Sequence, residues 1–373
     1  MPDTVTIAVG AVRWWLGNPI SLAMLRFLTG HDDCGYRLEN AMDYYLTGSN
    51  GTEYCWKCRL AGRILGWTCR RGGSIFGVDE TDIKGALSEE VFRKGLASVL
   101  EGFTRYGVTL PQRLHAPFLV VWDLTRACNL RCRHCYQRAG RPLPEELSTD
   151  EALALVDELA DAGVVALSLS GGEPLMRRDL FDIAARARDR GMYVSCASNG
   201  TLITPDVARR MKESGIEYVE ISLDAPDAAT HDAFRGMPGA FERTCAGVRA
   251  CVDAGLFTCV AATATRHTCP QVPDLYALSA DLGVQRFICF NFIPTGRGVE
   301  ITDQDLEPEQ REELLHYIFR QNGTGGPEAL STAPQFARVA VEGCEGSMAL
   351  GHFYYGDHFP DRTRALAEFI GGC

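Results

Sequence analysis

The pattern of apolar and polar positions changes near residue 113. Before that point, apolar residues recur at three- and four-residue spacing, most clearly over 89–100, and this spacing predicts a helix. We expect the helix to end at Tyr106-Gly107, because glycine readily adopts the left-handed conformation of a C-terminal cap. The sequence therefore predicts a mainly helical N-terminal domain over residues 1–113.

From residue 114 to about residue 300, short apolar runs alternate with amphipathic helical segments such as 150–162 and 241–254. The six apolar runs are 118–124, 164–170, 192–197, 218–223, 257–263 and 287–292. Strand–helix repeats of this kind predict parallel strands with right-handed crossovers, and the continuous apolar runs predict strands covered on both faces. The pattern leaves two α/β architectures open, an open doubly wound sheet and a partial barrel. Both place a functional site at the carboxyl ends of the strands.

A third region covers residues 301–373. An apolar stripe over 307–321 predicts a helix, so we expect this region to be a short helical tail.

The composition excludes several classes of function. The chain has 373 residues, of which 46% are hydrophobic and 23% charged, as in folded globular domains. A formal net charge of -11 disfavours nucleic acid as a partner, because it repels phosphate. No apolar run approaches the roughly 20 residues that a membrane span requires. Polar residues such as Arg13 and Asn18 interrupt the first apolar runs, unlike in a signal peptide. We therefore expect a cytoplasmic protein.

Cysteine usage carries the strongest chemical signal. The chain has 15 cysteines, and disulfides are rare in the cytoplasm. Most cysteines stand alone in apolar segments and are expected to be buried, but Cys128, Cys132 and Cys135 share one short loop after the first predicted strand. Three thiolates on one loop can occupy three corners of an iron–sulfur cubane and leave the fourth iron open. Simple burial, or a zinc site with a distant fourth ligand, are the alternatives.

Polar motifs follow the later strands at the same edge. Ser-Gly-Gly-Glu173-Pro follows the second strand, and its glycines would let a ligand approach the backbone closely beside an anionic side chain. Ser-Asn199-Gly-Thr follows the third strand, while Ser222, Asp224 and a downstream His-Asp-Ala-Phe-Arg235 follow the fourth. Each motif alone is an ordinary turn sequence, so their order and placement carry the argument.

Together these motifs resemble the radical S-adenosylmethionine (SAM) superfamily, whose hallmark is a CxxxCxxC loop after the first strand of a partial (βα)6 barrel. The resemblance implies a [4Fe–4S] cluster on Cys128, Cys132 and Cys135, and an open iron that chelates the amino and carboxylate groups of SAM. An electron from the cluster then cleaves SAM to methionine and a 5′-deoxyadenosyl radical, which abstracts a hydrogen atom from the substrate. The resemblance also implies oxygen sensitivity and an anaerobic or microaerobic host.

The resemblance assigns Glu173 to the SAM amino group, and Ser222 and Arg235 to its carboxylate. Asn199 and Asp224 are assigned as polar support, and the backbone near Ile293 to the adenine pocket. The full set of expected cofactor-binding residues is His134, Tyr136, Gly171, Gly172, Glu173, Pro174, Asn199, Ser222, Asp224, Arg235 and Ile293. No catalytic side chain beyond these is assigned. His134 and Ala225 depart from the usual pattern, which has an aromatic residue and a glycine at these positions.

Arginines surround the cysteine loop in an otherwise acidic chain, namely Arg126, Arg131, Arg133, Arg138 and Arg141. Three roles are expected for them: to offset the charge of the cluster and of SAM, to dock an acidic electron donor such as ferredoxin or flavodoxin, or to form a solvated basic loop. Arg297, in a turn after the sixth strand, is expected to face either substrate or solvent.

The motifs are most similar to the branch of the superfamily that matures peptides and cofactors. The expected substrate is therefore a peptide or a cofactor precursor related to haem or to a tungsten or molybdenum cofactor. This branch often continues into a cysteine-rich SPASM extension that holds auxiliary iron–sulfur clusters, and Cys344 and Cys373 would be early members of it. Two explanations stay open for the absence of the other cysteines of this extension: a truncated chain, and a family member without the extension.

Four N-terminal cysteines offer a second candidate metal site. Cys55 and Cys58 have metal-ligand spacing, and Cys34 and Cys69 would complete a four-sulfur set. Burial and a redox pair are the alternatives.

Two other functions compete with a radical SAM maturase. A non-catalytic electron-transfer or metal-binding protein would use the same cysteines without needing Glu173 or Ser222. A radical methyltransferase would usually show a cobalamin-binding domain or further methyl-carrying cysteines, for which the sequence gives no clear sign.

Overall fold

The computed structural model describes residues 18–48, 54–76, 79–109, 113–322 and 324–343. These residues fold into two compact units. One unit holds the described residues up to Phe118 together with Ala162–Val165, and the other holds Leu119–Asp161 and Ala166–Gly343. The predicted SPASM cysteines, Cys344 and Cys373, lie outside the described residues.

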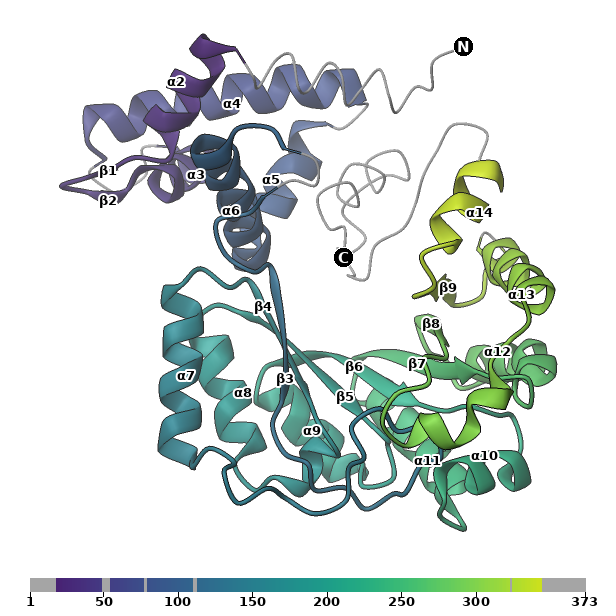
Figure 1. The fold of residues 1–373 in the computed structure, drawn as a ribbon. Coiled ribbons are helices and arrows are strands. Elements are labelled where there is room, and N and C mark those ends of the chain that lie inside the picture. Colours follow the sequence, from purple (N-terminus) through teal and green to yellow (C-terminus); the bar gives the residue numbers. More distant parts are fainter. Residues whose placement is uncertain (1–17, 49–53, 77–78, 110–112, 323, 344–373) are drawn as a thin grey trace. The chain divides into compact units, whose positions relative to one another are not determined.

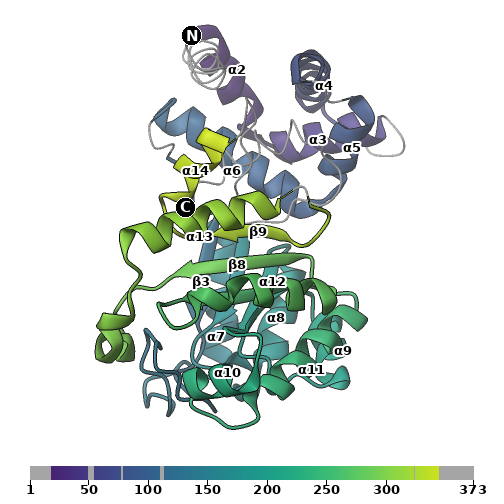
Figure 2. The same cartoon turned by 90° about the vertical axis from the view of Figure 1, so that its right-hand side faces the viewer.

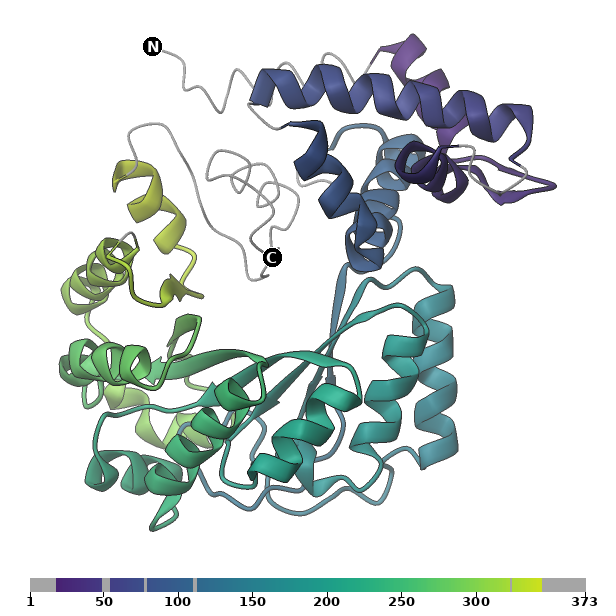
Figure 3. The same ribbon diagram turned by 180° about the vertical axis from the view of Figure 1, so that it is seen from behind.

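The first unit is mainly helical. Its elements are α2 (Pro19–Leu28), the hairpin strands β1 (His31–Asp32) and β2 (Gly35–Tyr36), α3 (Arg37–Thr47), α4 (Trp56–Phe76), α5 (Glu80–Ser88) and α6 (Glu90–Tyr106). Figure 3 shows α4 as the longest of these helices, beside α3. The helix predicted over 89–100 is α6. It is followed by Gly107, whose positive φ of 69° is a conformation that glycine adopts readily at a helix C-terminus. Apolar side chains from α2 to α5, including Leu28, Leu38, Met42 and Leu87, form the core.

The second unit is built on a seven-stranded parallel sheet, visible in Figure 1. Its strands are β3 (Leu119–Asp123), β4 (Ala166–Ser170), β5 (Tyr193–Ser198), β6 (Ile216–Ser222), β7 (Phe257–Ala264), β8 (Arg286–Asn291) and β9 (Glu328–Ser331). The connecting helices are α7 (Thr149–Asp161), α8 (Leu180–Asp189), α9 (Pro205–Glu213), α10 (Ala228–Arg235), α11 (Ala240–Asp253), α12 (Val272–Asp281) and α13 (Pro308–Gln321). All six strands predicted from the sequence are present, with ends shifted by a few residues.

The strand order decides between the two predicted architectures. The strands lie in the sequence order β3-β4-β5-β6-β7-β8-β9, and every neighbouring pair is parallel. A doubly wound sheet reverses its strand order at a switch point, whereas successive right-handed crossovers in one direction place the helices on one side. The second unit therefore has the barrel type of winding, which confirms the partial-barrel prediction.

The seventh strand was not predicted. Residues 301–343 were expected to form a helical tail, but they contain β9 between α13 and α14 (Phe336–Gly343). Figure 2 shows α13 alongside β9 at this edge of the sheet. Four residues are too few to display a strand's alternation, so β9 is recognisable only through its pairing with β8.

The two faces of the sheet differ more than the sequence pattern predicted. One face carries apolar side chains, such as Leu167, Val194 and Ile221, which are completely buried. The opposite face carries Ser168, Ser195, Glu220 and Ser222, which are only half-buried. The prediction of strands with two fully covered faces was therefore wrong for this polar face. A partly open polar face is what a site inside the curve of the sheet requires.

Within the described residues, no helix has the length and apolar character needed to cross a membrane.

Candidate functional site

The loop with Cys128, Cys132 and Cys135 leaves the carboxyl end of β3, as the sequence predicted. Cys132 is buried, and the other two cysteines are half-buried. Backbone N–H groups approach two of the sulfurs, Leu130 N at 3.4 Å from Cys128 Sγ and Ala139 N at 3.4 Å from Cys135 Sγ. The loop thus presents its thiols with donors already directed at them, and such donors stabilise metal-bound thiolates.

Glu173, at the end of β4, is completely buried. Its carboxylate accepts hydrogen bonds from Ser198 Oγ at 2.9 Å, Asn199 N at 2.8 Å and Leu175 N at 3.1 Å. Burial raises the pKa of Glu173, and these three hydrogen bonds oppose that rise. Since every one of these partners donates, the network favours an ionised carboxylate, which suits recognition of an ammonium group.

The glycines before Glu173 allow a close approach of the chain's own backbone. A Cβ at Gly171, where φ is 132°, would lie 2.5 Å from the carbonyl oxygen of Thr125. A Cβ at Gly172 would lie 2.3 Å from the carbonyl oxygen of Ala127. Gly172 N and Glu173 N donate to these same two carbonyl oxygens at 2.7 and 2.8 Å. The close approach therefore docks the Gly-Gly-Glu segment onto the beginning of the cysteine loop.

A second contact joins the cysteine loop to the turn after β5. Asn199 Nδ2 donates to Asn129 Oδ1 at 2.9 Å, and Asn129 Nδ2 donates to Thr201 Oγ1 at 2.8 Å. Asn199 Oδ1 accepts from Thr201 Oγ1 at 2.6 Å and so completes a closed set of side-chain hydrogen bonds. Asn199 thereby fixes Asn129, which lies next to Cys128.

A buried ion pair reaches the middle cysteine from the fourth strand. Arg235 Nε donates to Asp224 Oδ2 at 2.6 Å, and Arg235 Nη1 lies 3.6 Å from Cys132 Sγ. Asp224 Oδ1 also accepts from Thr263 N at 2.9 Å. Burial alone would raise the pKa of Asp224, but Arg235 and other neighbouring groups hold it below its usual value. The pair therefore places a fixed positive charge beside Cys132.

Arg297 is half-buried and binds the cysteine loop, so it is not the free, solvated turn arginine that was one of its two expected placements. Its Nε and Nη1 donate to the carbonyl oxygens of Cys132 and Ala139, each at 2.8 Å, and its backbone N donates to that of Cys135 at 2.8 Å. The preceding Gly296, with φ 59°, packs so closely that a Cβ would lie 2.2 Å from the carbonyl oxygen of Tyr136. The turn after β8 thus holds the cysteine loop by its backbone.

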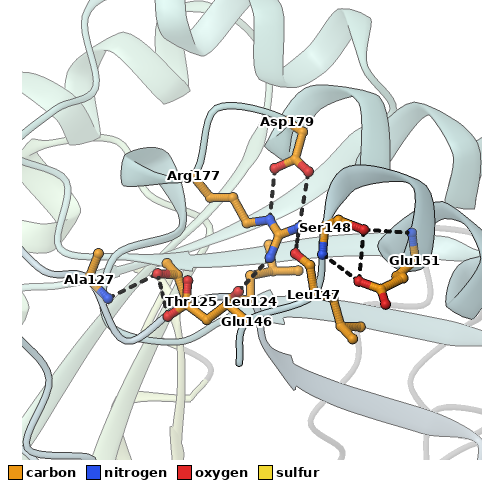
Figure 4. A network of polar contacts seen from close by, with 9 residues as sticks. All are labelled: Leu124, Thr125, Ala127, Glu146, Leu147, Ser148, Glu151, Arg177 and Asp179. Carbon is orange, nitrogen blue, oxygen red and sulfur yellow. Dashed lines mark hydrogen bonds and ion pairs between the residues drawn. The ribbon is translucent and has the colours of Figure 1, made fainter. Parts of the chain in front are cut away.

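A further polar network secures the beginning and end of the segment that follows β3 (Figure 4). Arg177 donates to the carbonyl oxygens of Leu124 and Leu147 at 2.9 and 2.8 Å and forms an ion pair with Asp179. Glu146 Oε1 accepts from Thr125 Oγ1 at 3.0 Å and also from two backbone N–H groups. The two ends of this long loop are therefore held by specific hydrogen-bond partners.

The remaining predicted residues lie at the same edge with fewer polar contacts. The His134 ring stacks on Phe234 with centroids 4.2 Å apart, and desolvation lowers the pKa of His134 to about 3, so the ring is neutral. Its Nδ1 is a buried atom without a hydrogen-bond partner. Tyr136 and Ile293 are exposed, at 60% and 63%, and Pro174 begins a short 3₁₀ turn. Ser222 ends β6 and is half-buried.

The donor set of the loop fits a metal cluster. Burial raises the pKa of Cys128 to about 11 and also raises the pKa of Cys132, so both are neutral thiols without a metal. A bound metal reverses this preference, because it holds cysteine as the thiolate. Three soft sulfur donors on a loop fixed by its neighbours suit an iron–sulfur cluster better than a hard, oxygen-binding cation.

A comparison with protein families settles the class of this domain. Residues 122–268 match the family model described as the Radical SAM superfamily. The chain carries a radical SAM domain. Proteins of this superfamily use a [4Fe–4S] cluster and SAM, and the named relatives of the chain are enzymes.

The relatives of this radical SAM domain include heme synthases and mycofactocin maturases. The chain is 40% identical over 223 residues to an AdoMet-dependent heme synthase of Nitratidesulfovibrio vulgaris, covering 59% of this chain and 61% of that protein. It is 33% identical over 239 residues to the mycofactocin maturase MftC of Mycolicibacterium smegmatis, covering 63% and 59%. The chain thus spans about three-fifths of the length of the curated relatives it matches.

The fold of the radical SAM domain recurs in solved structures. SuiB of Streptococcus suis, in a crystal structure with its precursor peptide SuiA, matches with a TM-score of 0.56 over 82% of this chain and 68% of SuiB. The sequence identity is 15%, so this similarity concerns the fold alone.

Several residues of the site were not identified from the sequence. Asn129, Glu146 and Arg177 hold the loops together, yet each lies in an ordinary polar segment. Asn129 had one available signal, its position between two metal-ligand cysteines. The others depend on which loops meet in space, and the sequence gives no such information.

Proposed function

We propose that this chain is a radical SAM enzyme that acts on a tetrapyrrole related to haem. The observation that carries the proposal is the hydrogen-bonded junction between the cysteine loop and Glu173. Glu173 N bonds to Ala127, the residue before Cys128, while the Glu173 carboxylate bonds to the turn that fixes Asn129. A metal site and an ammonium-binding carboxylate are thereby held together by the same contacts.

Each side chain takes a specific task in this proposal. Cys128, Cys132 and Cys135 hold a [4Fe–4S] cluster, and Glu173 binds the amino group of SAM. Ser222, at the half-buried end of β6, binds the SAM carboxylate together with Arg235. Arg235 has a second task, since its ion pair with Asp224 places its guanidinium beside Cys132.

The remaining predicted contacts complete the pocket. Gly171 and Gly172 allow the Gly-Gly-Glu segment to reach the cysteine loop, and Pro174 begins the turn that follows it. Asn199 fixes the loop through Asn129. The backbone at the exposed Ile293 lines the adenine side. The cofactors supply, when bound, one electron that converts SAM to methionine and a 5′-deoxyadenosyl radical able to take a hydrogen atom from the substrate.

The relatives favour a tetrapyrrole over a peptide as the substrate. AdoMet-dependent heme synthases from three organisms match at 37 to 40% identity, and a pre-heme d1 synthase matches at 40%. The mycofactocin maturases match at 31 to 33%. A peptide substrate is therefore the second choice.

The electron donor is proposed to be an acidic protein such as ferredoxin or flavodoxin. Arg131, Arg133, Arg138 and Arg141 are exposed on the cysteine loop, although the chain as a whole has a net charge of -11. A local basic surface on an acidic protein favours an acidic partner at that place. Arg126 does not contribute in the same way, because its guanidinium donates within the loop to Gln137 O at 2.5 Å.

Reaction of the reconstituted chain with iron coproporphyrin III tests the substrate class. We expect 5′-deoxyadenosine to form faster with this tetrapyrrole than without it, and deuterium to pass from a labelled tetrapyrrole into 5′-deoxyadenosine. A peptide that raises the yield where the tetrapyrrole does not would contradict the substrate proposal. A cluster that forms but never cleaves SAM would instead indicate the electron-transfer protein.

A further inference from the structure

A second group of metal-binding side chains lies in the helical unit, apart from the cysteine loop. Asp32, Cys34, Cys55 and Cys58 each offer one ligand atom, and these four atoms all lie within 4.8 Å of one another. The sequence predicted Cys69 as the fourth member of this set. Cys69 instead packs, half-buried, against the apolar core of the unit. Asp32 takes its place and changes the site from four sulfurs to three sulfurs and one oxygen.

Two separate structural elements bring these ligands together. Asp32 ends β1 and Cys34 lies in the tight turn of the β1–β2 hairpin, where Asp32 pairs with Gly35. Cys55 immediately precedes α4, and Cys58 lies in its first turn. Cys58 N donates to Cys55 Sγ at 3.4 Å, so the helix terminus itself holds Cys55 in position. A bound ion would thus cross-link the hairpin to α4.

The distances select a single ion over a cluster. The Sγ atoms of Cys55 and Cys58 are 3.4 Å apart. In tetrahedral zinc sites with Zn–S bonds of about 2.3 Å, two thiolates lie about 3.8 Å apart. In an iron–sulfur cubane each thiolate binds a different iron, so the sulfur atoms of the cysteines lie further apart than they do around a single ion. Four donors within 4.8 Å consequently match one tetrahedral ion.

The charged side chains around the four ligands also suit a divalent cation bound by anionic groups. Three thiolates and one carboxylate carry four negative charges, which is two more than Zn²⁺ neutralises. Arg37 offsets part of this excess, because its Nη2 lies 3.0 Å from Asp32 Oδ2, and its side chain is only 8% exposed. Cys34 N donates to the other oxygen, Oδ1, at 3.3 Å. Contacts of this kind orient a ligating carboxylate from the second coordination sphere.

We propose that Asp32, Cys34, Cys55 and Cys58 bind one structural Zn²⁺ ion. Binding releases the thiol protons and leaves no open coordination position, as in structural rather than catalytic zinc sites. The ion stabilises a hairpin of two-residue strands, which is marginal without additional contacts. This site is independent of the proposed enzymatic function, because none of its ligands belongs to the cysteine loop.

Zinc content of the full chain tests the proposal. The background is a Cys128→Ser/Cys132→Ser/Cys135→Ser triple variant, which removes the thiols of the other site. We expect one zinc per chain after dialysis, and loss of that zinc on addition of Cys55→Ser. The matched control is Cys69→Ser in the same background, which should keep the zinc. Asp32→Asn should weaken zinc binding at least tenfold, because the neutral amide replaces an anionic ligand.

Alkylation of the unmodified protein avoids reliance on variants that fail to fold. Zinc should protect Cys34, Cys55 and Cys58 from a maleimide, as mapped by peptide mass spectrometry, and should leave the protection of Cys69 unchanged. Absence of zinc from the triple variant, or equal zinc with and without Cys55, would overturn the proposal. A Cys55–Cys58 disulfide in protein isolated under reducing conditions would also overturn it, in favour of a redox pair.

Discussion

Arg297 Nε donates a 2.8 Å hydrogen bond to the carbonyl oxygen of Cys132, although 165 positions separate the two residues in the sequence. The turn after β8 thereby holds the loop after β3. Because the bond reaches the backbone rather than the thiol, it positions Cys132 without occupying the atom that binds metal. The integrity of the site therefore depends on arginines that fix the loop as well as on the cysteines.

The first prediction concerns this contact. Arg297→Lys keeps the charge but cannot reach both carbonyl oxygens, those of Cys132 and Ala139, with a planar fork. Losing one or two hydrogen bonds of about 1 kcal/mol each should reduce the iron retained per chain and speed cluster loss severalfold. Arg133→Lys, at an exposed position of the same loop, is the matched control. Equal iron retention in both variants would show that the Arg297 contact is dispensable.

The second prediction concerns the docking of the Gly-Gly-Glu segment. In Gly172→Ala, the new Cβ would lie 2.3 Å from the carbonyl oxygen of Ala127, so the segment must move away from the cysteine loop. We expect at least a tenfold loss of SAM cleavage in the reconstituted enzyme. Gly140→Ala serves as the control, because its Cβ meets nothing within 4 Å. Similar activity of the two variants would indicate that Gly172 has no steric role.

The third prediction concerns the ion pair beside Cys132. Asp224→Asn leaves the buried Arg235 without its anionic partner, and breaking a buried pair in this way typically costs about 3–5 kcal/mol. Urea unfolding should show this loss in the free energy of unfolding. Asp189→Asn removes an exposed ion pair with Arg188 and should cost less than about 1 kcal/mol. Comparable losses in the two variants would be inconsistent with a buried pair.

The fourth prediction concerns the pH dependence of stability. Burial raises the pKa of Glu220 to about 7, whereas an unfolded glutamate has a pKa of about 4.3. Between these values the folded chain keeps a proton that the unfolded chain has lost, so the contribution of Glu220 to the free energy of unfolding falls as pH rises. Over this window of about 2.7 pKa units the decrease is at most about 4 kcal/mol.

Glu220→Gln should remove this part of the pH dependence, because the amide does not titrate. Urea unfolding at pH 5 and pH 8 should therefore show a smaller difference for the variant than for the unmodified chain. Glu217→Gln, at an exposed position on the same strand, should keep the original difference. If Glu220→Gln and the unmodified chain respond identically to pH, the carboxyl group does not titrate in this range.

The sequence predicted the framework of the fold well, because that information is local. Each of the six predicted strands is a short apolar run next to a helix, and the cysteine loop follows the first of them directly. The strand β9 was missed because its four residues carry no recognisable period. Periodicity alone left the winding of the sheet open, since it does not show which strands are neighbours, and the partial barrel was predicted from the resemblance of the motifs.

The site was predicted less completely, because its contacts join distant segments. Polar residues at the strand ends were placed at the correct edge, by the rule that parallel strands present their carboxyl ends together. The partners of these residues were not predictable. Arg297 binds the backbone of the cysteine loop, and the glycines before Glu173 admit the backbone at the start of that loop, although the local sequence shows neither contact.

Cleavage of SAM by the reconstituted chain tests the central claim most directly. The chain is loaded with iron and sulfide under anaerobic conditions, reduced with dithionite and incubated with SAM, and 5′-deoxyadenosine is measured by chromatography. Cys132→Ala and Cys69→Ala are treated identically. We predict 5′-deoxyadenosine from the unmodified chain and from Cys69→Ala, and none from Cys132→Ala. Zinc in place of iron on the cysteine loop, or a yield that does not depend on Cys132, would contradict the claim.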